Sequence, residues 1–200
     1  STFGMTAPLQ GYKYRVGVGQ VFGDLSFTNY TVDVRKYIRL KPFTLAARAY
    51  SYIRSGKDED RLRGTYIGYP FFIRGFDNLN PAKVGGLSFD DLMGSRSVIG
   101  NFEVRLPFTG PEKLAAIKSS FLFTDLNLFF DAGLAWSRGS KIVGSISDKP
   151  LIPQLDANGA PVLDQSGLPI YRYDPNYRVP VFSAGVSLRI NLFGAMILEP

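Results

Sequence analysis

Residues 26–40, SFTNYTVDVRKYIRL, alternate apolar and polar side chains with a period of two. Successive side chains of a β-strand point to opposite faces, so this segment has one apolar face and one polar, partly charged face. The apolar face carries Tyr30, Val32, Val34, Ile38 and Leu40, and the polar face carries Asn29, Thr31, Asp33, Arg35 and Arg39. A strand of this length and pattern is typical of a transmembrane β-barrel, in which apolar side chains face lipid and polar ones face the interior.

The same alternation recurs along the chain and predicts an all-β, antiparallel transmembrane β-barrel. The predicted strands are residues 12–22, 26–40, 43–54, 97–108, 121–136 and 181–193, and a further strand begins near Ala195. They are about 11 to 16 residues long, whereas strands of soluble proteins usually have roughly five or six. Aromatic residues at the strand ends, such as Tyr12, Phe43 and Trp136, suit the interfacial girdles of membrane proteins. A soluble antiparallel sandwich or barrel, with its apolar face inside, is the alternative.

The connections between the predicted strands differ greatly in length. Gly23-Asp24 and Lys41-Pro42 form tight turns, whereas residues 55–95 and 137–178 form two long loops. Counted in order, both long loops lie at the same end of the sheet, which is the asymmetry of outer-membrane barrels. We therefore expect residues 1–200 to form one partial outer-membrane barrel domain. The chain begins at Ser1 without a Met or a leader pattern, and we interpret it as a piece of a longer protein.

The composition argues against several classes of function. The chain has no Cys and no His, which removes disulfides, thiolate nucleophiles, histidine bases and nearly all zinc sites. The net charge is +6, yet the sequence holds no recognised nucleic-acid module. We therefore expect no enzyme activity, no cofactor, no metal and no nucleic-acid partner. The acidic run Asp58-Glu59-Asp60 lacks the spacing of a calcium loop and is expected to be a solvated loop tip.

Three short motifs stand out within this framework. They are Ile73-Arg74-Gly75-Phe76 in the first long loop, Glu103 to Pro107 on the fourth predicted strand, and Phe129 to Gly133 on the fifth. In this order and spacing they resemble the bacterial surface antigen superfamily, whose members include BamA- and TamA-like barrels and two-partner secretion transporters. Leu106 stands where that family more often has an aromatic residue before the proline.

The resemblance covers nearly the whole chain and implies a fold and a function. It implies the C-terminal part of a sixteen-strand barrel in the bacterial outer membrane, from the ninth strand to the start of the fifteenth. Such proteins assist the insertion of outer-membrane proteins or move polypeptides across the membrane. Their implied partners are outer-membrane lipids, unfolded or secreted client polypeptides and accessory lipoproteins. A passive outer-membrane porin would show the same alternation, and it is the alternative function.

The resemblance also implies that the first long loop folds back into the lumen. Glu103 and Asp131 lie on the polar faces of adjacent predicted strands, and neighbouring carboxylates in a confined space need a cation. Arg74 can supply it through bidentate contacts, with Gly75 allowing a tight turn and Phe76 wedging the tip. The supporting strand positions of the motifs are Arg105, Pro107, Phe129 and Gly133. The competing interpretation makes Arg74 a solvated loop residue and Asp131 an isolated lumen charge.

Overall fold

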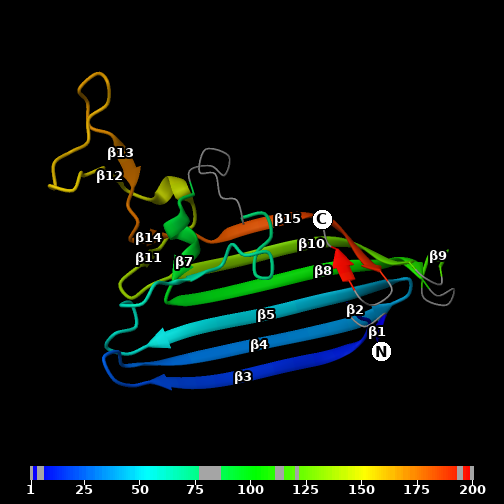
Figure 1. Ribbon diagram of the computed structural model, residues 1–200. Coiled ribbons are helices and arrows are strands. Elements are labelled where there is room, and N and C mark those ends of the chain that lie inside the picture. The colour runs from blue at the N-terminus through cyan, green and yellow to red at the C-terminus, as the bar shows by residue number, and fades with distance from the viewer. Residues whose placement is uncertain are drawn as a thin grey trace.

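The computed structural model describes residues 2–3, 7–76, 87–110, 115–119, 122–192 and 196–198. Its main body is one long, curved β-sheet, whose long strands run across the view in Figure 1. The long strands are β3 (Gly11–Val21), β4 (Phe27–Leu40), β5 (Phe43–Ser55), β8 (Arg96–Gly110), β10 (Leu122–Trp136) and β15 (Val181–Leu192). No helix within the described residues is long and apolar enough to cross a membrane.

The sheet is an antiparallel meander in which each long strand pairs with its neighbour in the sequence. The strand order is β16-β15-β10-β8-β5-β4-β3, with β16 (Met196–Leu198) and β3 at the two edges of the described sheet. The short strand β9 (Ile117–Lys118) pairs with β8 in parallel, and β1 (Thr2–Phe3) pairs separately with β2 (Ala7–Pro8). Each of the six predicted strands forms, with ends within two residues of the prediction. The predicted start at Ala195 lies outside the described residues.

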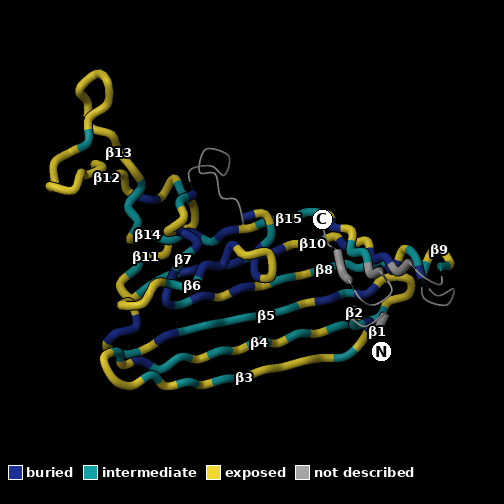
Figure 2. Tube along the Cα trace, in the orientation of Figure 1, coloured by how far each residue is buried: buried dark blue, intermediate teal, exposed yellow. Residues whose placement is uncertain are grey.

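The two faces of the sheet have the polarity that the alternation predicts. Val34 of β4 and Leu128 of β10 point outward and are 44% and 54% exposed. On the opposite face, Asn127 and Asp131 are completely buried. Figure 2 shows this change of burial from one residue to the next along the strands. The apolar side chains therefore lie outside and the polar ones on the inner face, as in a membrane barrel and opposite to a soluble one.

The described parts of the first long segment, residues 56–76 and 87–95, pack against the inner face at one end of the sheet. It holds β6 (Thr65–Tyr66), the 3₁₀ helix η1 (Phe89–Leu92) and β7 (Met93–Gly94), and β6 pairs with β7. Ile67, Ile73 and Leu92 of this segment are fully buried and pack in one hydrophobic cluster with Ile99 of β8 and Val181 of β15. The loop thus places an apolar core on the inner face of the sheet.

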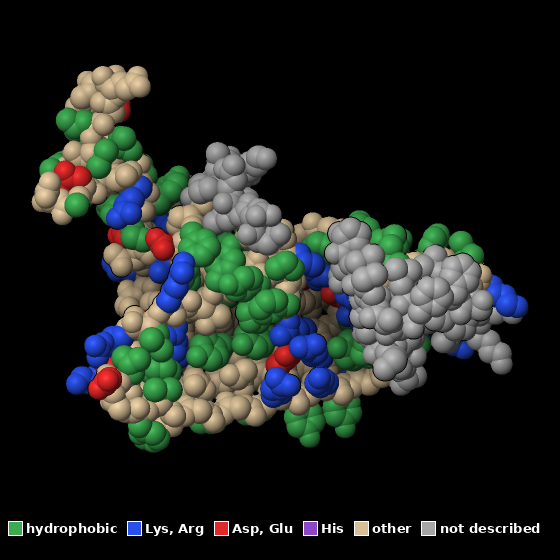
Figure 3. Space-filling model, in the orientation of Figure 1, with side chains coloured by type: hydrophobic (Ala, Val, Ile, Leu, Met, Phe, Trp, Pro, Cys, Tyr) green, Lys and Arg blue, Asp and Glu red, His purple; other side chains and the backbone are tan. Residues whose placement is uncertain are grey.

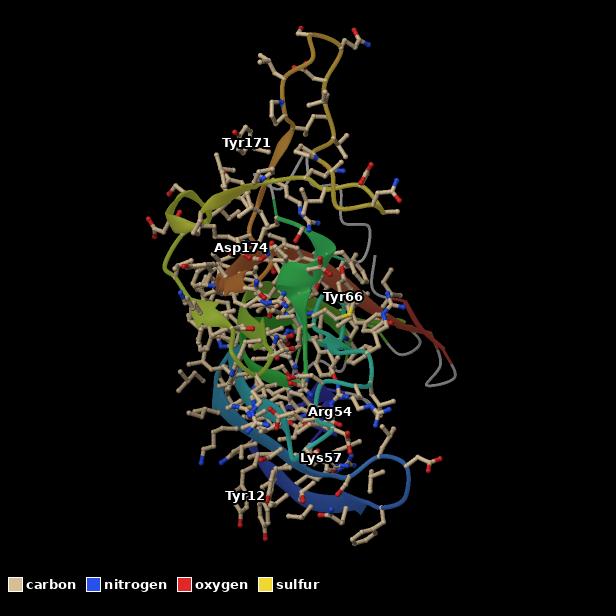
Figure 4. The ribbon with its side chains drawn as sticks, turned by 90° about the vertical axis from the view of Figure 1, so that its left-hand side faces the viewer. Tyr12, Arg54, Lys57, Tyr66, Tyr171 and Asp174 are labelled. Carbon is tan, nitrogen blue, oxygen red and sulfur yellow. The ribbon has the colours of Figure 1, made fainter. Side chains whose placement is uncertain are left out.

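The second long segment, between β10 and β15, lies at the same end of the sheet (Figure 1). Its elements are β11 (Lys141–Ile142), the 3₁₀ helix η2 (Ile146–Asp148), β12 (Leu151–Pro153), β13 (Tyr171–Tyr173) and β14 (Tyr177–Arg178). The paired strands β12 and β13 project away from the sheet, so that Tyr171 lies far out and Asp174 nearer to the sheet (Figure 4). Lys149 of this segment forms a buried ion pair of 2.7 Å with Asp91 of the first segment.

The prediction that Asp58-Glu59-Asp60 forms a solvated tip is wrong for its first two residues. Asp58 is 7% and Glu59 is 2% exposed. Asp58 accepts a hydrogen bond from the Ser26 amide at 3.0 Å, and Glu59 accepts one from the Gly56 amide at 3.0 Å. Glu59 also pairs with Arg96 at 2.7 Å. Both carboxylates are therefore used to anchor the start of the long loop to the rim of the sheet.

Candidate functional site

The motif of the first long segment sits at a tight turn. The amides of Phe72 and Ile73 both donate to the Tyr69 carbonyl, at 2.8 and 3.0 Å. Gly75 follows with φ of +86°, a left-handed conformation that glycine adopts without steric cost. The turn presents Arg74 to the inner face while Ile73 enters the apolar cluster.

Arg74 lies between the two carboxylates of the adjacent strands β8 and β10. Its Nε and Nη2 donate to the two oxygens of Asp131, each at 2.7 Å, and its own amide donates to Asp131 at 3.1 Å. Its Nη1 donates to Glu103 at 2.8 Å. The guanidinium therefore makes a bidentate pair with one carboxylate and a single contact with the other, the strongest class of hydrogen bond in proteins.

The charges of this cluster are balanced, and its side chains are mostly buried. Arg74, Glu103 and Asp131 have side chains that are 16%, 12% and 0% exposed. Arg105 donates to the second oxygen of Glu103 at 2.6 Å, so Glu103 lies between two guanidinium groups. Burial lowers the pKa of Arg74, but the hydrogen bonds and charges of Asp131 and Glu103 outweigh burial and raise it. Arg74 therefore stays charged at every physiological pH.

Aromatic and glycine residues shape the space around Arg74. The Phe129 ring lies 3.8 Å from the guanidinium, in cation–π contact. Gly185 of β15 lies opposite Phe129 in the sheet, and a Cβ there would approach the ring to 2.7 Å. A Cβ on Gly133 would collide with the end of the Ile73 side chain. Each of these two glycines thus leaves room for one side chain of the site.

The remaining motif residue, Pro107, lies farther along β8 and has a different role. The pairing of β8 with β10 shifts between Thr124 and Asp125, where Asp125 is opposite Pro107 and Thr124 is opposite Thr109. Proline has no amide to donate, and bulges are among the few places where a sheet accepts it. Pro107 is therefore associated with an irregularity in the wall of the barrel and makes no contact with Arg74.

The structure adds three residues that the sequence motifs did not single out. Asn101 donates from Nδ2 to Asp131 at 2.8 Å and to the Phe72 carbonyl at 2.6 Å. The Tyr66 hydroxyl donates to the Phe76 carbonyl at 2.5 Å, and Phe76 is buried in the apolar cluster. Asn101 and Gly185 occupy inner-face positions of their strands, where the alternation places polar and small residues, and could have been found there. Nothing in the sequence points to Tyr66.

A hollow of about 730 Å³ lies beside the loop tip. Its charged lining residues are Arg35, Arg48, Arg74, Glu103, Arg105 and Arg189. Basic and acidic side chains gather next to an apolar group in the middle of the face shown in Figure 3. The described residues include no group of three or more His, Cys, Asp or Glu that could hold a metal. This arrangement is suited to holding a loop in place by charge-assisted hydrogen bonds.

Comparison with known proteins assigns the chain to a family. No curated protein and no solved structure gave a significant match. The Omp85 superfamily domain matches residues 6–193, which include all three motifs and all six long strands. Its members are bacterial outer-membrane proteins of protein insertion and secretion, in agreement with the surface-antigen resemblance. The chain belongs to the Omp85 superfamily.

Proposed function

We propose that this chain is part of an outer-membrane barrel that assists the insertion of outer-membrane proteins or the translocation of polypeptides. The protein works in the bacterial outer membrane without covalent chemistry, cofactor or nucleic acid. Lipids contact the apolar outer face, and unfolded or secreted polypeptides are the clients, with accessory lipoproteins as partners. Unpaired strand edges offer backbone hydrogen bonds to a client strand.

The main support for this proposal is that the tip of the first long loop is bound to the inner face of the sheet. Arg74 pairs there with Asp131 and Glu103, and the same loop builds an apolar cluster around Ile73. A passive porin needs an open, water-filled interior. A loop held by buried ion pairs and an apolar core favours a largely closed barrel that moves polypeptides.

Single-channel conductance of the full-length protein in planar bilayers tests this proposal. We expect a mostly closed channel with brief fluctuations, and longer open periods in Arg74→Ala, because removing one partner of a buried ion pair costs on the order of 3 kcal/mol. Arg138→Ala is the control, since Arg138 is an exposed arginine of the second long loop. A large, steady open pore in the wild-type protein would instead identify a porin.

A charge exchange tests the pairing itself. Arg74→Asp and Asp131→Arg each place two like charges together, whereas the double variant restores opposite charges at the same two positions. We expect the double variant to recover part of the closed state and of client insertion that both single variants lose. A double variant that performs no better than either single one would disprove the functional importance of the pair.

A further inference from the structure

A second set of contacts holds the loop tip at the two residues that precede the Arg74 motif. Arg48 of β5 donates from Nη1 to the Phe71 carbonyl at 2.7 Å, and Asn101 of β8 donates to the Phe72 carbonyl at 2.6 Å. Arg48 and Asn101 are direct partners in the register of β5 and β8. Two neighbouring side chains of the sheet thus hold two consecutive backbone carbonyls of the loop.

Arg48 is oriented for this contact by Asp33 of β4. Its Nε and Nη2 each donate to one oxygen of Asp33 at 3.1 Å, which leaves Nη1 to reach the loop. The side chains of Arg48 and Asp33 are only 17% and 14% exposed. The Arg48 guanidinium also lies 5.9 Å from the centre of the Phe72 ring, which packs against the Tyr50 ring at 4.9 Å and the Phe71 ring at 4.4 Å. Arginine suits this position because its planar guanidinium group can donate hydrogen bonds to a carboxylate and a carbonyl at the same time.

The Arg48 contact adds strands that Arg74 does not use. Arg74 joins the loop to β8 and β10, whereas Arg48 joins it to β5 and, through Asp33, to β4. The loop tip therefore bridges four consecutive strands of the sheet. We propose that Arg48, oriented by Asp33, is a positioning residue that forms a second clamp on the loop tip and keeps the tip lodged when the Arg74 contacts are broken.

This inference rests on the proposed function, in which the position of the loop tip on the inner face controls whether the barrel is closed. Its consequence is that the loop leaves the inner face only when both clamps open. Loss of Arg74 alone then changes the channel less than loss of both arginines. Because the two clamps act on the same short turn, their effects on release are coupled and exceed the sum of the single effects.

These 200 residues contain no cysteine, so one spin label can be placed at the loop tip of the full-length protein once any cysteine elsewhere in it is replaced by serine. Tyr69→Cys is suitable, because Tyr69 is half exposed and contributes its backbone carbonyl to the turn. Label mobility is measured in Arg48→Ala, Arg74→Ala and the double variant. A hydrogen bond from a charged donor is worth a factor of ten or more, so we expect roughly a tenfold larger ratio of mobile to immobile label in the double variant than in Arg74→Ala.

Arg35→Ala is the matched control. Arg35 also pairs with Asp33, donating from Nη2 at 2.7 Å and from Nε at 3.0 Å, and it donates to this carboxylate rather than to the loop. Its loss should therefore leave the label immobile. Arg48→Lys should immobilise the label more than Arg48→Ala does and less than the wild type. An ammonium group still supplies a hydrogen-bond donor, but it lacks the planar guanidinium geometry. Equal mobility in Arg74→Ala with and without Arg48, or an effect of Arg35→Ala as large as that of Arg48→Ala, would overturn the inference. Conductance is a separate measurement, so an immobile tip in a steadily open pore would refute the proposed function and leave the second clamp intact.

Discussion

Glycine residues on the inner face show how single positions control the site. Gly133 lies under Ile73, and Gly185 lies under the Phe129 ring that supports Arg74. Both occupy strand interiors, where glycine is normally unfavourable. Their presence at inner positions is explained by the side chains that fill the space a Cβ would take.

Gly133→Ala should therefore loosen the loop tip. The new methyl group would collide with the Cδ1 end of Ile73, and because Ile73 is fully buried its neighbours must move with it. Overpacking of this kind typically costs about 1–3 kcal/mol. Denaturant unfolding of the refolded protein in detergent micelles measures the loss. Gly100→Ala is the control, because a Cβ at Gly100 on β8 meets no atom within 4 Å. Equal destabilisation by the two substitutions would contradict the assigned role of Gly133.

At the scale of elements, the long loops are held to the sheet and to each other by buried charges. Asp58 and Glu59 anchor the first loop at its start, and Lys149 joins the second loop to Asp91 of the first. The side chains of Lys149 and Asp91 are each 2% exposed. Removing one member of such a pair leaves a buried charge without its partner, so the two loops are expected to loosen together.

The Asp58 anchor gives the loop a pH dependence with a definite sign. The hydrogen bond from the Ser26 amide lowers the pKa of Asp58 below its usual 3.8, against the opposing effect of burial and with help from Arg61. Its contribution to stability is complete above pH 3.8 and is lost as the pH falls through the lower pKa of the folded state. The protection of the Ser26 amide, measured as its exchange rate relative to the intrinsic rate at the same pH, should therefore decrease at acid pH in the wild type.

Asp58→Asn provides the comparison for this measurement. The amide cannot ionise, so protection of Ser26 in this variant should be weaker at neutral pH and should not change over the acid range. An identical pH profile in the wild type and Asp58→Asn would show that another group controls the loop.

The projecting part of the second loop contains a tandem repeat with an eight-residue period. Its two units begin at Leu155 and Leu163 and share the pattern Leu-Asp-x-x-Gly-x-Pro. Each aspartate accepts two backbone hydrogen bonds from its own turn, and each turn closes on a glycine with positive φ. The two turns therefore have the same structure because they have the same local sequence.

For the whole molecule, the decisive property is that the apolar face of the sheet points outward. Leu128 lies near the middle of β10 and Leu163 lies on the projecting part of the second loop, and they are 54% and 55% exposed. Leu128→Arg places a charge where lipid is expected, which costs about 2–4 kcal/mol near the centre of a bilayer. Leu163→Arg makes the same change at equal exposure in water and should have little effect. Folding yield into lipid vesicles distinguishes them, and equal yields would argue against a membrane-facing surface.

Local sequence was sufficient to predict the strands, their order in the sheet and which face of each strand is apolar. The period of two in residues 26–40 and its recurrences predict strands whose ends match the structure within two residues. The strands and their faces depend on residue type and spacing along a strand, so a single sequence carries them. That Glu103 and Asp131 lie near Arg74 was implied by the resemblance of the three motifs to the surface-antigen superfamily.

The loop contacts depend on distances that no local pattern encodes. Arg48 binds a backbone carbonyl 23 positions away, and Lys149 reaches an aspartate 58 positions away. A carbonyl is present at every residue, so the sequence does not mark Phe71 as the acceptor. Asp58 and Glu59 were predicted to be solvated because charged side chains usually stay in water. Only the folded chain brings the backbone amides and the arginine that form hydrogen bonds with these carboxylates. Periodicity therefore determines the wall of the barrel, whereas the way the loops are secured to it follows from long-range packing.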